Sequence, residues 1–222
     1  MKQFIYHLIA LFIFTTAVST AYAQQPPFYN DIQAFKKKDS ASFPAKQAIL
    51  FVGSSSFTKW TDVQDYFPGY PILNRGFGGS SLPDLIRYAE DVIFPYQPKQ
   101  IVIYCGDNDL AASDTVTVQM VVDRFETLFG MIRKRLGKVP VLYVSIKPSP
   151  SRSRLMPKML ETNMRIKQFL SKQRKTAFAD VYHKMLNADG TPIKDLFVED
   201  NLHMNKSGYA IWKEVIGPLL IK

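Results

Sequence analysis

Residues 48–56 read AILFVGSSS, an apolar run that ends at a glycine followed by three serines. Short apolar runs of this kind recur along the chain with longer helical patterns between them, which is typical of buried parallel strands joined by helices. The order predicts a single α/β sandwich. Its five predicted strands are Ala48–Val52, Pro71–Leu73, Gln100–Cys105, Val139–Ile146 and Thr176–Val181.

The clearest predicted helix lies between the third and fourth strands and ends at Gly137. Its apolar residues fall on one helical face: Val118, Val121, Val122, Phe125, Leu128, Phe129, Ile132 and Leu136. Weaker helical patterns cover Pro83–Val92, with Ser81 as the N-cap, Pro157–Ser171 and Ser207–Leu219.

The first 23 residues have the pattern of a signal peptide. Lys2 supplies a positive end, an apolar run from Leu8 to Phe14 follows, and Ala21-Tyr22-Ala23 matches the small residues that precede cleavage. The apolar run is short for a membrane span. We therefore expect a secreted or periplasmic protein with no stable membrane anchor after cleavage of residues 1–23; a retained N-terminal anchor is the alternative.

The rest of the chain has the composition of one globular domain, with 46% hydrophobic and 21% charged residues. Residues 24–47 are polar and contain prolines, so we expect an N-terminal lead-in with one short helix. The domain itself is expected at 48–222.

Charge and cysteine content narrow the class of protein. The net charge is +9, but Lys and Arg are scattered and no basic stretch is interleaved with stacking aromatics, so we expect no nucleic-acid partner. The single cysteine, Cys105, lies in an apolar run, and we expect it to be buried in a strand. Because one cysteine cannot form a disulfide within the chain, we expect no disulfide framework even if the protein is exported.

Three polar segments directly follow predicted strands, at residues 53–56, 74–80 and 106–109. In an open parallel sheet, ligands bind beyond the carboxyl ends of the strands. These segments are therefore expected to face one crevice, and the chemistry of the protein is expected there.

A serine in this crevice needs a base to become a nucleophile near neutral pH. After residue 23 the sequence offers His183 and His203, and each follows an aspartate in the spacing Asp-x-x-His, Asp180 and Asp200 respectively. The spacing alone does not choose between them. We favour His203, because Asp180 falls in a predicted strand whereas 200–203 lie in a loop before a helix.

The glycines at 76, 78 and 79 do not form a dinucleotide-binding fingerprint, because Ser81 stands where the third glycine is required. Residues 53–57 lack the second glycine of the α/β-hydrolase nucleophile elbow. Gly79 can instead present its backbone N–H to a developing oxyanion, and the Asn108 amide can supply a second donor from the neighbouring strand end. The alternative is that Gly79 and Asn108 are ordinary turn residues without a catalytic role.

Four blocks, in this order, resemble the SGNH or GDSL-like hydrolases. ILFVGSSSF at 49–57 resembles the family's early strand with its Gly-Asp-Ser block, and NRGFGGS at 74–80 its Asn-Arg-Gly-x-x-Gly block. YCGDND at 104–109 resembles Gly-x-Asn-Asp, and DNLHMNKSGY at 200–209 the late Asp-x-x-His. The resemblance spans about residues 48 to 212, and four ordered blocks are more specific than any one.

The resemblance implies a flavodoxin-like α/β/α fold with three layers and a five-stranded parallel sheet. It implies Ser55 as nucleophile, His203 as base and Asp200 as the residue that orients the base. Gly79, Asn108 and the Ser55 backbone N–H would form the oxyanion hole, and neither a metal nor an organic cofactor is required.

One position departs from the family pattern, because Ser54 stands where the first block usually has Asp. A hydroxyl replaces some of a carboxylate's hydrogen bonds but none of its charge. The three consecutive serines also leave Ser54 or Ser56 as alternative nucleophiles.

We expect hydrolysis of carboxylic esters, with a small-molecule or glycan ester as substrate. The loops 147–157 and 182–199 carry no long apolar stretch to line an acyl tunnel, which favours short acyl groups, and export favours acetyl esters on carbohydrate. A lysophospholipid or another small ester is the alternative.

Two other hypotheses remain at this stage. One is a metal-dependent hydrolase that uses Asp107, Asp109, Asp200 and His203. The other is a catalytically weak, glycan-binding relative, motivated by Ser54. The sequence does not indicate the oligomeric state.

Overall fold

The computed structural model describes residues 25–222, so the predicted signal peptide at 1–23 lies outside the described residues. Five strands form one parallel sheet in the order β2-β1-β3-β4-β5. They are β1 (Ile49–Gly53), β2 (Ile72–Asn74), β3 (Gln100–Tyr104), β4 (Val141–Val144) and β5 (Thr176–Ala179). All five predicted strands are confirmed, with ends that differ by at most two residues.

The central strands are buried on both faces. Every residue of β1, β3 and β4 is buried, which explains why these strands, after the polar Gln100 that begins β3, are continuous apolar runs rather than alternating ones. In the register of the sheet, Ile49 pairs with Ile72 on one side and with Gln100 on the other. Cys105 is buried as expected, but it lies one residue beyond β3.

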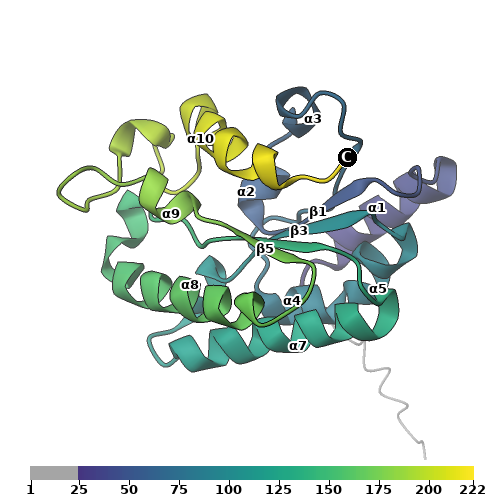
Figure 1. The fold of residues 1–222 in the computed structure, drawn as a ribbon, viewed down its shortest axis with the longest axis horizontal. Helices are drawn as coiled ribbons and strands as arrows, with labels where there is room; N and C mark the ends of the chain where they lie inside the picture. Colours follow the sequence, from purple (N-terminus) through teal and green to yellow (C-terminus); the bar gives the residue numbers. More distant parts are fainter. Residues whose placement is uncertain (1–24) are drawn as a thin grey trace, which may run out of the picture.

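Helices cover both faces of the sheet (Figure 1). On one face lie α4 (Leu82–Arg87), α5 (Ala89–Val92), α7 (Val118–Leu136) and α8 (Met156–Ser171). On the other lie α2 (Ser55–Thr58), α3 (Val63–Tyr66), α9 (Val181–Lys184) and α10 (Lys206–Ile216). The expected three-layer α/β/α sandwich is therefore the observed fold, with one apolar cluster on each side of the sheet.

The helix α7 has the bounds that its apolar face predicts. Thr117 caps its first turn by accepting a hydrogen bond from the Met120 backbone N–H at 3.2 Å, and Gly137 follows its last residue. The predicted helix 83–92 is instead the two short helices α4 and α5, which meet at the non-helical Tyr88. At the other end of the chain, Pro218 follows α10 in a 3-10 turn, η4 (Gly217–Leu219).

The lead-in contains the expected helix, α1 (Tyr29–Ala41), and this helix packs against the domain. Ile32 is buried in the core, and the ring of Phe28 meets that of Phe77 edge to face at a centroid distance of 5.3 Å. Farther along α1, Asp39 forms an ion pair with Arg75 and accepts a hydrogen bond from the Tyr96 hydroxyl at 2.6 Å. The N-terminal helix is therefore attached to the segment that follows β2.

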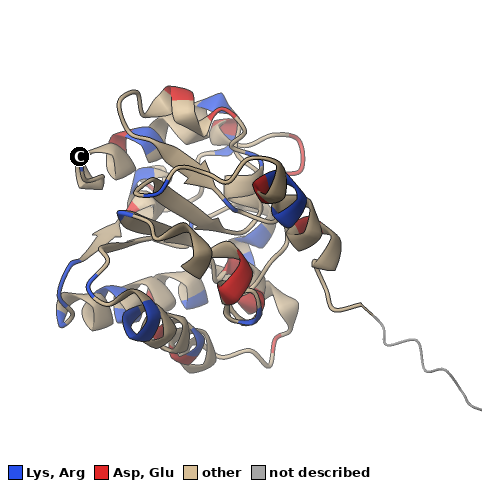
Figure 2. Cartoon of the chain, turned by 90° about the vertical axis from the view of Figure 1, so that its right-hand side faces the viewer, with Lys and Arg blue, Asp and Glu red and all other residues tan. Residues whose placement is uncertain are grey.

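The charged residues are scattered over the molecule, as the sequence predicts. Lys and Arg residues are spread over several helices and interleaved with Asp and Glu, as Figure 2 shows for one side of the molecule. No helix within residues 25–222 is long and apolar enough to cross a membrane.

Candidate active site

A sharp turn at the end of β1 places three serines at the carboxyl edge of the sheet. Gly53 has a φ of +150°, and a Cβ there would overlap the carbonyl oxygen of Tyr104, so the chain needs glycine at this point. Ser54 and Ser56 are 1% and 2% exposed, whereas Ser55 is only partly buried. Ser55 is therefore the serine of the three that is accessible from solvent.

His203 reaches this serine from the loop before α10. Its Nε2 atom lies 2.9 Å from Ser55 Oγ, and its Nδ1 atom lies 2.6 Å from Asp200 Oδ2. The other carboxylate oxygen of Asp200 accepts hydrogen bonds from the backbone N–H groups of Leu202, at 2.9 Å, and His203, at 2.8 Å. The aspartate thus holds both the imidazole and the loop that carries it.

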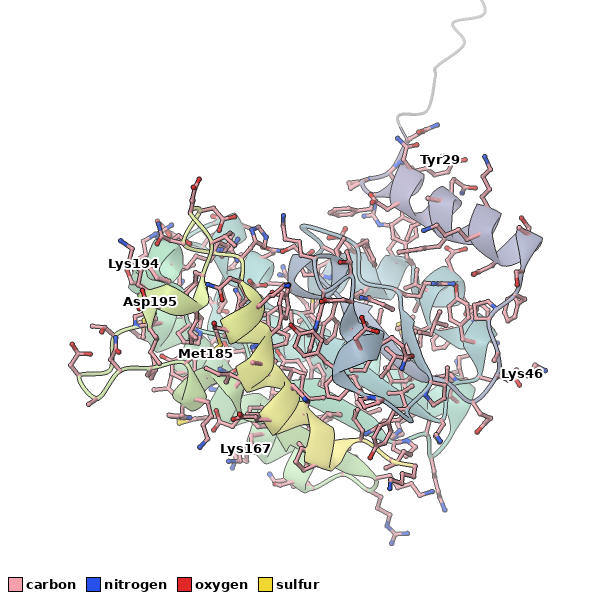
Figure 3. The ribbon with its side chains drawn as sticks, turned by 90° about the horizontal axis from the view of Figure 1, so that it is seen from above. Tyr29, Lys46, Lys167, Met185, Lys194 and Asp195 are labelled. Carbon is pink, nitrogen blue, oxygen red and sulfur yellow. The ribbon has the colours of Figure 1, made fainter. Side chains whose placement is uncertain are left out.

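The loop is fixed at its two ends. A β-bridge joins Phe197 to Met204, and the Val198 backbone N–H donates to the His203 carbonyl oxygen at 2.9 Å. Asn205 then caps α10 and also donates to the Asp195 carbonyl oxygen at 2.8 Å. Figure 3 shows Lys194 and Asp195 beside the start of α10, the helix that follows the histidine loop.

Asp200 is suited to pair with a protonated imidazole. Desolvation acts to raise the pKa of its carboxyl group, but hydrogen bonds from the His203 ring and from the backbone of His203 and Leu202 outweigh it. The pKa of Asp200 therefore lies well below the usual range for an aspartate, and the group stays ionised at neutral pH.

The second Asp-x-x-His pair also forms, but it lies elsewhere. The strand β5 ends at Ala179, so Asp180 is the N-cap of α9 rather than a strand residue. His183 Nδ1 is 2.8 Å from Asp180 Oδ2, and the histidine side chain is 63% exposed. The structure therefore brings His203, and not His183, to Ser55.

The predicted oxyanion donors lie on the two segments next to Ser55. A Cβ at Gly78 would stand 3.8 Å from that of Ser55, and the exposed Gly79 follows with a φ of +84°. Asn108, in α6 (Asp107–Ala112), donates from Nδ2 to Ser54 Oγ at 2.7 Å and to the Ser80 carbonyl oxygen at 3.0 Å. Ser55, Asp200, His203, Gly79 and Asn108 therefore lie at one edge of the sheet, whereas His183 does not reach it.

Arg152 is a site residue that the sequence analysis missed. It lies in η2 (Pro150–Leu155), after β4, and its Nη2 donates to Asn108 Oδ1 at 2.8 Å while Nη1 donates to Asp107 Oδ2 at 3.0 Å. The sequence assigned the loop 147–157 no site residue and indicated only that it carries no long apolar stretch to line an acyl tunnel. Its place after a strand end, like that of the other three segments, was the available signal.

Lys147, on the same loop, is fully buried near the site. Its Nζ atom lies 6.0 Å from the ring centroid of Tyr104 and 5.9 Å from that of Phe197. Burial lowers the pKa of Lys147 to about 8, although the charge of Asp107 acts in the opposite direction. A cationic Lys147 is therefore less favourable in the folded protein than in water.

The carboxylates proposed as metal ligands have other partners. Asp107 pairs with Arg152, and Asp109 accepts hydrogen bonds from the Leu82 backbone N–H at 2.9 Å and from Arg124 at 2.8 Å. Across residues 25–222 no three His, Cys, Asp or Glu side chains are grouped closely enough to hold a metal ion. The donor set of the metal hypothesis is therefore not assembled.

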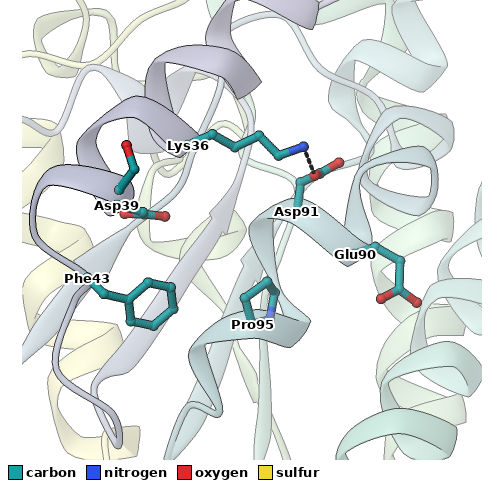
Figure 4. A pocket seen from close by; sticks show the side chains of 7 residues that line it. Lys36, Asp39, Phe43, Glu90, Asp91 and Pro95 are labelled. Atoms are coloured by element: carbon teal, nitrogen blue, oxygen red, sulfur yellow. Dashed lines mark ion pairs between the residues drawn. The ribbon is translucent and has the colours of Figure 1, made fainter.

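A surface hollow of about 290 Å³ lies away from these groups, between α1 and the segment from Glu90 to Pro95 (Figure 4). Lys36 and Asp91 form an ion pair across it at 2.7 Å, and Phe43 stands at its edge. None of its lining residues belongs to the Ser55 site.

Solved structures share this fold. A candidate platelet activating factor from Streptococcus pneumoniae is 19% identical with a TM-score of 0.75, over 86% of this chain and 92% of the other. A GDSL-like lipase from Bacteroides thetaiotaomicron is 18% identical with a TM-score of 0.73, over 85% and 96%. A variant of an acetyl xylan esterase from Geobacillus stearothermophilus is 14% identical with a TM-score of 0.62, over 78% and 94%.

The sequence comparisons identify the family. A comparison with curated proteins found no match. The family model of the GDSL-like lipases and acylhydrolases matches residues 48–211, which include every block of the site. The chain therefore belongs to the GDSL-like lipase/acylhydrolase family and is a hydrolase of ester bonds.

Proposed function

We propose that the protein is a serine esterase that removes short acyl groups through an acyl-serine intermediate. The observation that carries the proposal is the continuous chain of contacts from Ser55 Oγ through the His203 ring to the Asp200 carboxylate. This is the arrangement of nucleophile, base and orienting group that activates a serine hydroxyl.

In the first half-reaction, His203 Nε2 takes the hydroxyl proton of Ser55 while Oγ bonds to the ester carbonyl carbon. The carbonyl electron pair moves to oxygen, which becomes the oxyanion beside Gly79 and Asn108. When the carbon–alkoxy bond breaks, His203 gives its proton to the leaving oxygen, and an alcohol departs. Water then repeats the same steps on the acyl-serine, which releases the carboxylic acid and restores the Ser55 hydroxyl.

The surroundings of Gly79 support the proposal that the substrate carries a short acyl group. A Cβ on Gly79 would lie 3.7 Å from the Phe28 ring, so this ring borders the glycine pair next to Ser55. Phe28 is held in place by its contact with Phe77, and Tyr88 donates to the Pro27 carbonyl oxygen at 2.7 Å. A ring fixed so close to the proposed oxyanion position leaves little room for a long acyl chain on that side.

Acetyl esters of carbohydrates are the proposed natural substrates. Two arguments support this: the signal-peptide pattern at residues 1–23, which implies work outside the cytoplasm, and the similarity in fold to an acetyl xylan esterase. We propose accordingly that the mature protein is secreted or periplasmic.

The test is a series of p-nitrophenyl esters from acetate to octanoate, followed by acetylated xylo-oligosaccharides, with residues 24–222 and the Ser55→Ala variant. We expect kcat/KM to fall with chain length, acetate to be released from the oligosaccharides, and Ser55→Ala to be inactive. Fractionation of cells that express the full-length chain, with N-terminal sequencing of the product, tests export and cleavage after residue 23.

Other outcomes discriminate the alternatives. A rate that rises with chain length would favour a lysophospholipase-like enzyme. Binding of the oligosaccharides without turnover of any ester would favour a glycan-binding relative. Full activity in Ser55→Ala would exclude the proposed mechanism altogether.

A further inference from the structure

We propose that Arg152 is a positioning residue that orients the side-chain amide of Asn108 toward the oxyanion. The inference rests on the proposed function, because it concerns the oxyanion hole of that reaction. It is carried by the hydrogen bonds that surround the Asn108 amide on both of its ends.

An asparagine amide serves an oxyanion hole only in one of its two orientations. Nδ2 offers two N–H donors, whereas Oδ1 can only accept, so a flipped amide would present an oxygen to the oxyanion and repel it. The groups around Asn108 must therefore distinguish its nitrogen from its oxygen.

On the nitrogen side, one partner fixes the orientation and the other does not. The Ser80 carbonyl oxygen can only accept, and it lies 3.0 Å from Nδ2. The Ser54 hydroxyl, 2.7 Å from Nδ2, can either accept or donate. Because these two contacts use both N–H groups of Nδ2, the oxyanion must share or take over the N–H that faces the Ser54 hydroxyl. The aspartate that the family usually carries at this position would only accept when ionised, so the replacement by Ser54 removes one determinant of orientation.

On the oxygen side, Arg152 supplies a strict determinant. A guanidinium can only donate, and Nη2 of Arg152 lies 2.8 Å from Asn108 Oδ1. The second nitrogen, Nη1, donates to Asp107, whose other carboxylate oxygen accepts the Asn108 backbone N–H at 3.0 Å. The planar fork thus holds the amide and the start of its helix together.

The position of Arg152 is itself fixed. Its side chain is 17% exposed, and the neighbouring Ser151 backbone N–H donates to the Asn201 carbonyl oxygen at 3.1 Å, in the loop that carries Asp200 and His203. The segment Ser151–Arg152 therefore connects the oxyanion side of the site with its histidine side. The positive charge of the Arg152 guanidinium beside Oδ1 also polarises the amide, which strengthens Nδ2 as a hydrogen-bond donor.

The test compares kcat and KM for p-nitrophenyl acetate in Arg152→Met, Asn108→Ala and the double variant. We expect Asn108→Ala to lower kcat by about 10²- to 10³-fold, as for other side-chain oxyanion donors. Arg152→Met is expected to lower kcat by about ten- to a hundred-fold with little change in KM, because it leaves the amide present but oriented by the Ser80 carbonyl oxygen alone. The double variant is expected to be no worse than about three-fold below Asn108→Ala, because both changes remove the same contribution.

Arg154→Met is the matched control. Arg154 lies two positions away, is 68% exposed and pairs with the exposed Asp114, so its replacement is expected to leave kcat and KM unchanged. If Arg152→Met melts below the assay temperature, Arg152→Lys is measured instead. It keeps a charge near Asp107 without the planar fork, and we expect a lower kcat at unchanged KM.

A second measurement does not depend on activity. The two side-chain N–H signals of Asn108, assigned with Asn108→Ala, are expected to shift or broaden in the NMR spectrum of Arg152→Met and to stay in place in Arg154→Met. Unchanged signals, a normal kcat in Arg152→Met or Arg152→Lys, or losses that multiply in the double variant would each overturn the proposal. Inactivity of the wild type would overturn the proposed function instead and leave the NMR comparison to decide on Arg152.

Discussion

Ser55 Oγ and His203 Nε2 lie 2.9 Å apart although 148 residues separate them in the chain. The contact arises because β1 ends at the carboxyl edge of the sheet and the loop before α10 returns to the same edge. The Asp200 carboxylate then holds the imidazole from its other side at 2.6 Å.

The two Asp-x-x-His pairs give an internal comparison of the histidine's role. His203→Ala is expected to lower kcat for p-nitrophenyl acetate by at least about 10⁴-fold, because no other base reaches Ser55 among the described residues. His183→Ala, which removes an exposed histidine with the same spacing, is expected to stay within two-fold of the wild type. Equal losses in the two variants would contradict the assignment of His203 as the base.

Phe28 is expected to limit acyl-chain length. Phe28→Ala removes the ring beside Gly79, so the ratio of kcat/KM for butanoate to that for acetate is expected to rise about ten-fold. Butanoate has two methylene groups more than acetate, and burying each of them in the space left by the ring is worth roughly 0.8 kcal/mol. Phe43→Ala, which removes an exposed aromatic ring stacked on Tyr96, is the control and is expected to leave the ratio unchanged.

The ion pair between α1 and the segment after β2 is expected to matter for stability. Asp39→Ala leaves the nearly buried Arg75 guanidinium without its carboxylate and is expected to lower the free energy of unfolding by about 3 kcal/mol in urea titrations. Asp91→Ala breaks the more exposed pair with Lys36 and is expected to cost less than about 1 kcal/mol. A similar cost for both changes would mean that the buried pair contributes no more than a surface one.

Lys147 is expected to make stability depend on pH in the alkaline range. Its pKa is about 8 in the folded protein and 10.5 as the ordinary value, so between these pH values the unfolded chain binds more protons than the folded one. The free energy of unfolding therefore rises with pH over this window, and the cost of the buried charge is fully present below pH 8.

Lys147→Met removes this cost. We expect the variant to be more stable than the wild type at pH 7, by an amount on the order of 1–3 kcal/mol, and the difference to shrink toward pH 10.5. Thermal melting at several pH values measures it, with Lys46→Met, an exposed lysine, as the control. A variant less stable at every pH would show that the contacts of Lys147 with Tyr104 and Phe197 outweigh its desolvation.

The elements with a regular buried face could be predicted from the sequence. The helix α7 buries seven of its apolar residues on one face, and β1, β3 and β4 are apolar except for Gln100 at the start of β3, so each leaves a periodic or continuous signal. The site could be located because its segments follow strand ends and because histidine is scarce after residue 23. The family resemblance then supplied the roles of Gly79 and Asn108.

The rest depends on contacts that leave no local signal. In α1 only Ile32 is buried, so the packing of this helix produces almost no periodicity in the sequence. The ion-pair partner of Asp39 in this helix, Arg75, is 36 residues away. Arg152 and Arg154 stand in a repeated Ser-Arg pattern and cannot be told apart by composition. Only the turn of η2 decides that the first points to Asn108 and the second to solvent.

The packing of α1 and of residues 212–221 limits how far a gene for this hydrolase can be shortened. The family match begins at residue 48 and ends at 211, yet Ile32 before it and Trp212, Ile216 and Leu220 after it are buried. Gln100, the first residue of a central strand, also bonds to the backbone of Leu219 at 2.9 Å and of Ile221 at 3.0 Å. A polypeptide trimmed to the matched residues would expose apolar surface on both faces of the sheet, so expression that starts from the family boundaries should yield aggregates rather than an inactive enzyme.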